Sequence, residues 1–229
     1  MDHIDFSIVL HVWPHLWQGL KFSFMLTVAA FAIGMVLGTI FAIIQHLQVP
    51  VLSPIVKTYI TIMRSIPLIL VLFWFFFLVP IVLGYFSSSG RPIPIGPVYA
   101  AYITFGLFEA AYYSEIMRVG LRSISRGQFE AAQALALSTF QTYRFVIMPQ
   151  VLRVTAPIIL SQTIILFQDT SLVYVVSLTD LLGAASKIAQ LNGRLIEMYV
   201  TVAIIYLLIC SALSQIVTFL KKRAEPMTR

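Results

Sequence analysis

The sequence predicts an all-α membrane protein with about five transmembrane helices, the N-terminus outside and the C-terminus inside. Of its 229 residues, 59% are hydrophobic and 10% are charged, whereas soluble domains average roughly 25% charged residues. Runs long enough to cross a hydrocarbon core of about 30 Å recur along the chain. We therefore expect residues 1–229 to form a single transmembrane domain.

The predicted spans lie between short polar breaks, at residues 19–44, 56–83, 98–117, 151–167 and 198–220. The first follows Trp13 and Trp17, an aromatic pair that suits a membrane interface. Within it, Gly34 and Gly38 have the spacing that lets helix backbones approach closely, and we favour packing within the subunit as its purpose.

Segments 87–97 and 171–197 are expected to be connections on one side of the membrane. The second is long enough for a short helix that begins after Asp180, because Asp is a favoured N-cap residue. Segment 118–150, between the third and fourth spans, is expected to be a loop on the opposite side.

The predicted orientation rests on the Lys and Arg residues beside the spans, which concentrate on the cytoplasmic side of membranes. Ten follow spans one, three and five: Lys57, Arg118, Arg122, Arg126, Arg144, Arg153, Lys221, Lys222, Arg223 and Arg229. Three lie on the other side: Arg91, Lys187 and Arg194. Segment 118–150 and the C-terminus are therefore expected in the cytoplasm.

Two capping-box patterns occur in the cytoplasmic loop, Ser125-x-x-Gln128 and Ser138-x-x-Gln141. They predict a short helix over residues 128–137 and a second that starts at residue 139. The first is rich in strong helix formers, and Phe129 and Leu135 offer apolar anchors for a partner protein. The patterning alone is equally consistent with an amphipathic linker on the membrane surface.

Part of this loop resembles a known motif. Glu130-Ala131-Ala132 with Ala134-Leu135, followed by Ile147-Met148-Pro149, is similar to the EAA loop of bacterial ABC importer permeases. Ala136 stands where that pattern usually has Gly, and because Ala favours helix we expect a firmer turn there. The resemblance implies that Phe129, Glu130, Ala131, Ala132, Leu135 and Ala136 contact an ATPase as a coupling helix.

Further segments resemble the polar amino-acid uptake branch of these permeases, and most of all the membrane subunits of glutamate/aspartate importers. They are Arg64-Ser65-Ile66-Pro67-Leu68, residues 109–116, residues 123–128 and residues 167–172. At the substrate level the resemblance also allows another polar or basic amino acid.

The resemblance implies a complex in the bacterial inner membrane. Its parts would be two permease subunits, similar or identical and expected to be a heterodimer, a cytoplasmic ATPase dimer, and a periplasmic or surface solute-binding protein. The chain contains no G-x-x-x-x-G-K-[ST] phosphate loop. We therefore expect it not to be an enzyme and to bind no cofactor, with ATP and Mg bound by the partner ATPase. No basic patch with interleaved aromatics indicates nucleic-acid binding.

Arg64, Glu109, Glu115 and Asp169 lie within the predicted spans or at their ends and are candidates for function, because a charge costs at least about 2.5–3.5 kcal/mol at the centre of a membrane. Glu109 shares a helix face with Tyr112 and Tyr113. These three side chains are expected to line the substrate pathway. The alternative for Glu109 is a structural carboxyl that is hydrogen-bonded within the protein.

The other three allow two interpretations each. Arg64 and Glu115 lie near the cytoplasmic ends of their spans, and an ion pair between them is slightly favoured. Alternatively, Pro67 interrupts its helix and Arg64 helps to bind a substrate carboxylate. Asp169, between Gln168 and Thr170, either caps the next segment or contacts the pathway. The substrate-pathway candidates are thus Arg64, Pro67, Glu109, Tyr112, Tyr113, Glu115, Gln168, Asp169 and Thr170.

Other chemistry is disfavoured. The single cysteine, Cys210, can form no intrachain disulfide, and the four histidines have no metal-binding spacing. An ion-coupled secondary transporter would be expected to contain two inverted repeats, into which five spans do not divide. A membrane assembly factor would not need a carboxyl at the depth of Glu109.

Overall fold

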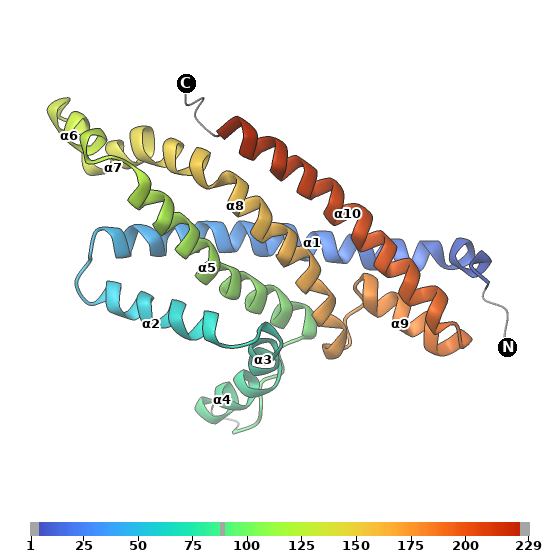
Figure 1. Ribbon diagram of the computed structural model, residues 1–229. Coiled ribbons are helices and arrows are strands. Elements are labelled where there is room, and N and C mark those ends of the chain that lie inside the picture. The colour runs from blue at the N-terminus through green and yellow to red at the C-terminus, as the bar shows by residue number, and fades with distance from the viewer. Residues whose placement is uncertain (1–4, 88–89, 225–229) are drawn as a thin grey trace.

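The computed structural model describes residues 5–87 and 90–224, which are mostly helical and contain no strand (Figure 1). The α-helices are α1 (Ser7–His46), α2 (Leu52–Ser65), α3 (Leu68–Phe73), α4 (Val79–Phe86), α5 (Pro97–Ser123), α6 (Arg126–Ala134), α7 (Thr139–Gln141), α8 (Met148–Asp169), α9 (Leu181–Asn192) and α10 (Leu195–Ala224). Two π-helical segments, η1 (Trp74–Leu78) and η2 (Thr142–Ile147), and one 3₁₀ helix, η3 (Thr170–Val176), connect some of them.

The centre of the bundle is the packing of α1 against α5, the most extensive contact between any two helices in the described part of the chain. Gly38 allows it, because a Cβ there would lie 2.8 Å from the backbone nitrogen of Ser114. At Gly34 a Cβ would lie 2.9 Å from the Cβ of Glu109. The predicted use of this glycine pair within the subunit is confirmed.

Within the described residues, four helical stretches are long and apolar enough to cross a membrane: Ser7–His46, Leu68–Phe86, Thr139–Val176 and Leu195–Lys222. Helix α5, which contains the predicted third span, is not among them. Its 27 residues would extend about 40 Å at the α-helical rise. It carries four charged residues but is packed among α1, α2, α3 and α8, which can shield polar groups from lipid. That α5 crosses the membrane, which would bring the number of spans to five, therefore stays a prediction.

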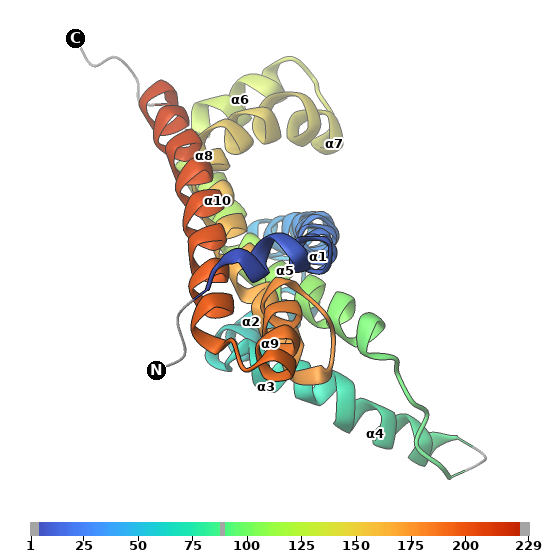
Figure 2. The ribbon, with the colours of Figure 1, turned by 90° about the vertical axis from the view of Figure 1, so that its right-hand side faces the viewer.

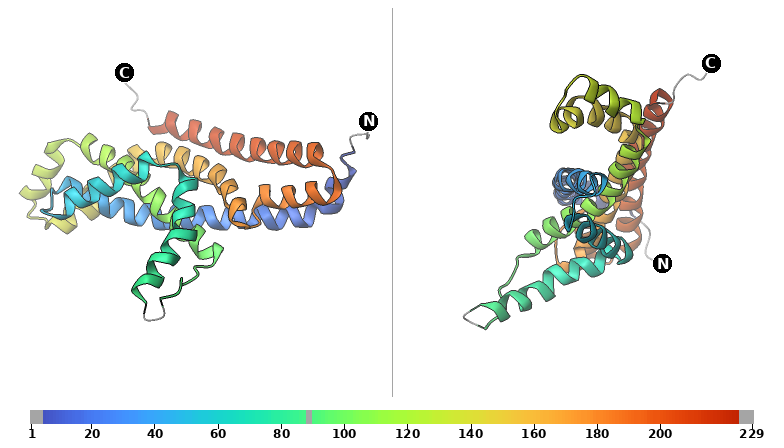
Figure 3. Two further views of the ribbon diagram at one scale, coloured as in Figure 1. Left: turned by 90° about the horizontal axis from the view of Figure 1, so that it is seen from below. Right: turned by 90° about the vertical axis from the view of Figure 1, so that its left-hand side faces the viewer.

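The second predicted span, 56–83, is not one helix. Helix α2 ends at Ser65, and Ile66 is extended with φ −115° and ψ 137°. The physical reason is Pro67, whose ring disfavours helical backbone at the residue before it. After this break the chain changes direction: α3 packs against α5, and α4 projects from the bundle (Figures 2 and 3).

The connection before α10 contains the predicted short helix. Asp180 is its N-cap, since its carboxylate accepts hydrogen bonds of 2.9 Å from the backbone nitrogens of Leu182 and Gly183. This prediction is confirmed as helix α9. Helix α9 then packs between α1 and α10.

The ends of the bundle can be compared with the predicted sidedness. Helices α6 and α7 and the C-terminal end of α10 lie toward one end of the molecule, and α4 lies toward the opposite end (Figures 1 and 2). This arrangement agrees with the placement of the loop and the C-terminus on one side. Of the basic residues used for that prediction, Arg229 lies outside the described residues.

Candidate functional site

The loop between α5 and α8 forms a helical hairpin in which α6 packs beside η2. Its second capping box is present: the Gln141 nitrogen donates to Ser138 Oγ at 3.2 Å, and the Ser138 nitrogen donates to Gln141 Oε1 at 2.9 Å. The prediction of a first capping box, at Ser125, is wrong. Ser125 is the N-cap, but its side chain makes no cap hydrogen bond, and the Gln128 nitrogen donates to the Ser125 carbonyl at 3.1 Å. The reciprocal bond is also missing, because Gln128 Oε1 accepts from Gln150 Nε2 at 3.1 Å.

Helix α6 covers Arg126–Ala134, so the predicted end at residue 137 is also wrong. Ala136 has a φ of +50°, in the left-handed region. Its nitrogen donates to the Gln133 carbonyl at 2.9 Å, and the nitrogen of Leu137 donates to the Ala132 carbonyl at 3.1 Å. These two bonds are the Schellman motif, in which glycine is the preferred left-handed residue. Ala136 therefore ends the helix and does not extend it.

The predicted coupling residues fall on two different faces of α6. Phe129 faces inward, with its ring 5.9 Å from that of His46 and 6.1 Å from that of Tyr143. Ala132 is also inward, with 2% of its surface exposed. These two attach α6 to the end of α1 and to η2. Phe129 is half-buried in these contacts, and its contact with a partner protein stays a prediction.

The outward face carries the remaining predicted coupling residues. Glu130, Ala131 and Ala136 are exposed, and Leu135 has 74% of its surface exposed. This face is available to a partner protein. The contact of Phe129 with His46 was missed at the sequence level, because nothing in the local pattern relates the end of α1 to residue 129.

Deep in the bundle, Glu109 is hydrogen-bonded to the protein. It is 1% exposed, and Gln162 Nε2 on α8 lies 3.2 Å and 3.3 Å from its two carboxylate oxygens. Tyr113 is fully buried, with its hydroxyl 3.0 Å from Thr163 Oγ1. In this conformation, these two residues join α5 to α8 and line none of the cavities described below. Gln162 was missed, although a Gln within an apolar span is itself a signal.

Four of the predicted pathway residues meet at one cavity of about 460 Å³, which contains Arg64, Pro67, Tyr112 and Asp169 in its wall. The break at Pro67 exposes the end of α2 to this cavity. The Arg64 guanidinium lies over the Tyr112 ring, 5.5 Å from its centroid. Asp169 makes no side-chain cap hydrogen bond to the following helix. The capping interpretation of Asp169 is therefore wrong.

The expected ion pair between Arg64 and Glu115 is not formed. Glu115 is bound instead by Arg118, whose Nε donates to Oε2 at 2.9 Å and whose Nη2 contacts Oε1. The two residues are three apart on one helix, where side chains are neighbours. The nearer partner thus replaces the one on α2.

The remaining candidates are dispersed. Thr170 is fully buried and its hydroxyl donates to the Phe167 carbonyl at 2.7 Å. Gln168 lies in the wall of a different cavity, between α8 and α10. The described residues contain no cluster of His, Cys, Asp and Glu able to hold a metal ion.

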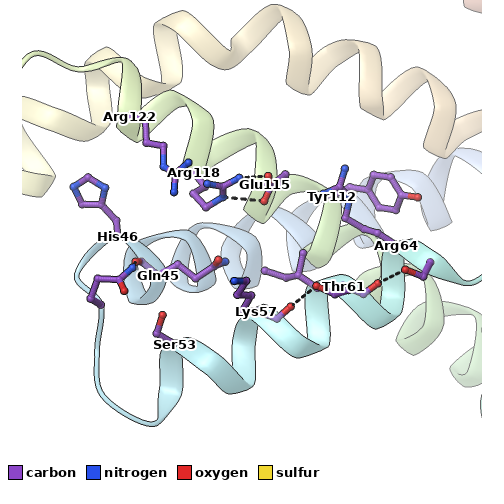
Figure 4. Close-up of a pocket in the computed structure, with 13 residues that line it drawn as sticks. Gln45, His46, Ser53, Lys57, Thr61, Arg64, Tyr112, Glu115, Arg118 and Arg122 are labelled. Carbon is purple, nitrogen blue, oxygen red and sulfur yellow. Dashed lines mark hydrogen bonds and ion pairs between the residues drawn. The ribbon is translucent and has the colours of Figure 1, made fainter.

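A larger cavity of about 710 Å³ lies between the C-terminal end of α1, α2 and the second half of α5 (Figure 4). Its wall includes Lys57, Arg118 and Arg122, which were not among the predicted site residues. Their signal in the sequence was their charge at the predicted cytoplasmic ends of spans. The two cavities share Arg64, Ser65 and Tyr112.

Comparisons with known proteins agree with this architecture. Residues 34–226 match the family model described as "Binding-protein-dependent transport system inner membrane component". The chain is 39% identical over 225 residues to the glutamate/aspartate import permease protein GltK of Escherichia coli O157:H7, covering 97% of this chain and 99% of that protein. It is 38% identical over 183 residues to the probable glutamine ABC transporter permease protein GlnP of Bacillus subtilis strain 168, covering 78% and 77%.

Solved structures share the fold. A crystal structure of an amino acid ABC transporter with histidines superimposes with a TM-score of 0.81 at 25% identity, covering 96% of this chain and 99% of that one. An inward-facing structure of the MetNI methionine ABC transporter gives a TM-score of 0.69 at 21% identity, covering 93% and 98%.

Proposed function

Because this chain belongs to the family of binding-protein-dependent transport system inner membrane components and is an ABC importer permease, we propose that its substrates are acidic amino acids, glutamate and aspartate. It is a multi-pass protein of the inner membrane and is not itself the ATPase of its transporter. The likeness to a glutamate/aspartate permease along nearly the whole chain supports this substrate class.

The observation that carries the proposal is the pair of opposite charges in the smaller cavity. Arg64 and Asp169 both line this cavity, together with Tyr112. Arg64 would bind a substrate carboxylate with its planar fork of donors, and Asp169 would bind the ammonium group. Glu109, held by Gln162, would position α5 against α8.

The complex we propose contains a cytoplasmic ATPase dimer, which binds ATP and Mg, and a periplasmic or surface solute-binding protein. A second, similar permease subunit would complete the pathway as a heterodimer. The outward face of α6, with Glu130, Ala131 and Leu135, would contact the ATPase. Movement of α6 would reach α1 through the Phe129–His46 contact and α8 through η2.

The test is uptake into proteoliposomes that contain the complex and its binding protein. Arg64→Lys keeps the charge but removes the bidentate fork. We expect it to raise the KM for L-glutamate and L-aspartate about tenfold or more, as for a charge-assisted hydrogen bond worth roughly 1.5 kcal/mol. Arg153→Lys, at an exposed position on α8, is the matched control.

The results separate the alternatives. Unchanged affinity and uptake in Arg64→Lys would remove Arg64 from substrate contact. Uptake of L-glutamine in preference to L-glutamate would assign the neutral substrate named for the B. subtilis relative. Uptake that requires an ion gradient and no ATP would support a secondary transporter instead.

A further inference from the structure

The larger cavity, between α1, α2 and α5, has an unusual charge. Four cationic side chains lie in its wall, Lys57, Arg64, Arg118 and Arg122, with one carboxylate, Glu115. Figure 4 shows side chains from α2 and α5 approaching this space from opposite sides. Arg118 neutralises Glu115 through two contacts. The excess positive charge of the wall is therefore not compensated by the cavity itself.

The other cations have no carboxylate partner among the residues that the structure describes. Neither Lys57 nor Arg122 forms an ion pair there, and Arg64 contacts the Tyr112 ring. Guanidinium and ammonium groups bind carboxylates and phosphates through charge-assisted hydrogen bonds. An anion in this cavity would supply the missing acceptors.

One uncharged group of the wall, the Gln45 amide, also lacks an acceptor. Gln45 Nε2 is buried and has no hydrogen-bond partner. The hydroxyls of Thr61 and Ser65 donate to backbone carbonyls of α2, at 2.9 Å and 2.7 Å. A buried amide donor without an acceptor is uncommon, and here it lies beside unpaired cations. Both observations favour an anionic ligand.

The position of the cavity relates it to the substrate. Arg64, Ser65 and Tyr112 line both cavities. An acidic amino acid that leaves the smaller cavity therefore enters the larger one next. The basic residues of α5 lie at its predicted cytoplasmic end. With Glu115 occupied by Arg118, the larger cavity has no free carboxylate for an ammonium group.

We propose that this cavity is an exit site that binds an acidic amino acid by its two carboxylates, with no requirement for its ammonium group. The exit role rests on the proposed function, because it assumes that acidic amino acids pass through. The site selects dicarboxylates by charge, and neutral amino acids bind it weakly. It differs from the Arg64–Asp169 cavity in lacking a group that recognises the ammonium end.

Radiolabelled glutarate, a dicarboxylate without an amine, is the probe. Equilibrium binding is measured on the complete complex with its ATPase, without nucleotide or binding protein, in nanodiscs of phosphatidylcholine. We expect saturable binding that L-glutamate displaces and that L-glutamine displaces at least tenfold less well. The double variant Lys57→Gln/Arg122→Gln should bind glutarate at least tenfold more weakly.

The control variant Arg153→Gln/Lys221→Gln removes the same two charges at exposed positions outside the cavity, and should bind as the unmodified complex does. Absence of glutarate binding, or equal weakening in both variants, would overturn the proposal. So would displacement by inorganic phosphate at the same concentration as L-glutamate, or loss of binding in phosphatidylglycerol nanodiscs, since either would identify a phosphate or lipid-headgroup site.

The two proposals fail in different ways. Glutamate uptake by the complex without glutarate binding would refute the exit site and leave the proposed function standing. Glutarate binding without uptake of any acidic amino acid would refute the proposed function, and with it the exit role.

Discussion

Ala136 provides a sharp test of the local structure, because a residue with a side chain occupies a left-handed position at the end of α6. Its φ is +50°, and the two hydrogen bonds of the Schellman motif depend on that conformation. The perturbation is Ala136→Gly, which removes the Cβ and leaves the backbone bonds in place.

The expected magnitude follows from two opposing terms. A non-glycine residue in the left-handed region costs roughly 1–2 kcal/mol. Glycine increases the entropy of the unfolded chain, which offsets about 0.4–1 kcal/mol of that gain. A net stabilisation of about 0.5–1 kcal/mol remains for the loop, equivalent to roughly a two- to fivefold increase in hydrogen-exchange protection.

The assay is amide hydrogen exchange of the chain in detergent, followed at Ala136 and Leu137, whose nitrogens donate the two bonds. Ala131→Gly is the matched control, since Ala131 is exposed within α6. Glycine inside a helix costs about 0.5–1 kcal/mol, so this variant should lower protection. Lower protection in Ala136→Gly as well would refute the assignment of residue 136 to a left-handed cap.

Three other changes test the packing and the coupling helix. Gly38→Leu should prevent stable packing of α1 against α5, because its Cβ would lie 2.8 Å from the Ser114 nitrogen. The control Gly127→Ala should be tolerated, because a Cβ there would have no atom within 4 Å. Thermal unfolding in detergent compares the two variants. Glu130→Arg on the exposed face of α6 should abolish uptake and co-purification with the ATPase without changing the melting temperature, and continued uptake would contradict docking at this face. Phe129→Ala should retain the ATPase but reduce transport per ATP hydrolysed by several-fold, since it removes the ring contact with α1; unchanged coupling would exclude that route.

The structure also changes the expected result at Ala132. The family resemblance implies that Ala132 contacts the ATPase, so Ala132→Asp would be expected to test docking, but this residue is almost fully buried. An unpaired carboxylate there would destabilise the loop itself. A loss of transport in that variant would not identify a partner contact, whereas Glu130→Arg retains that meaning.

The predictions that succeeded depended on chemistry contained within short segments. Asp180 caps α9, and Ser138 with Gln141 forms a capping box, because each cap bonds to backbone within three residues. Pro67 ends α2, as the alternative interpretation of the second span held, because its ring restricts the residue before it. Gly34 and Gly38 predicted a close helix contact but did not identify α5 as the partner.

The predictions that failed concerned side chains that more than one partner could reach. Gln128 was expected to complete a cap, but Gln150 on α8 is within reach and binds it. Glu115 was expected to pair with Arg64, but Arg118 is nearer on the same helix. In each case the sequence offered two partners of equivalent chemistry. The distances in the folded chain decided which partner is bound.

By itself, the sequence determined a helical membrane protein, because the cost of placing polar groups in hydrocarbon acts along each segment. Its short motifs carried the resemblance to the ABC importer permeases. Only the tertiary structure decided which face of α6 is free and that Arg64 lies between two cavities of different charge. Those outcomes depend on distances between helices that are remote in sequence, which no local pattern contains.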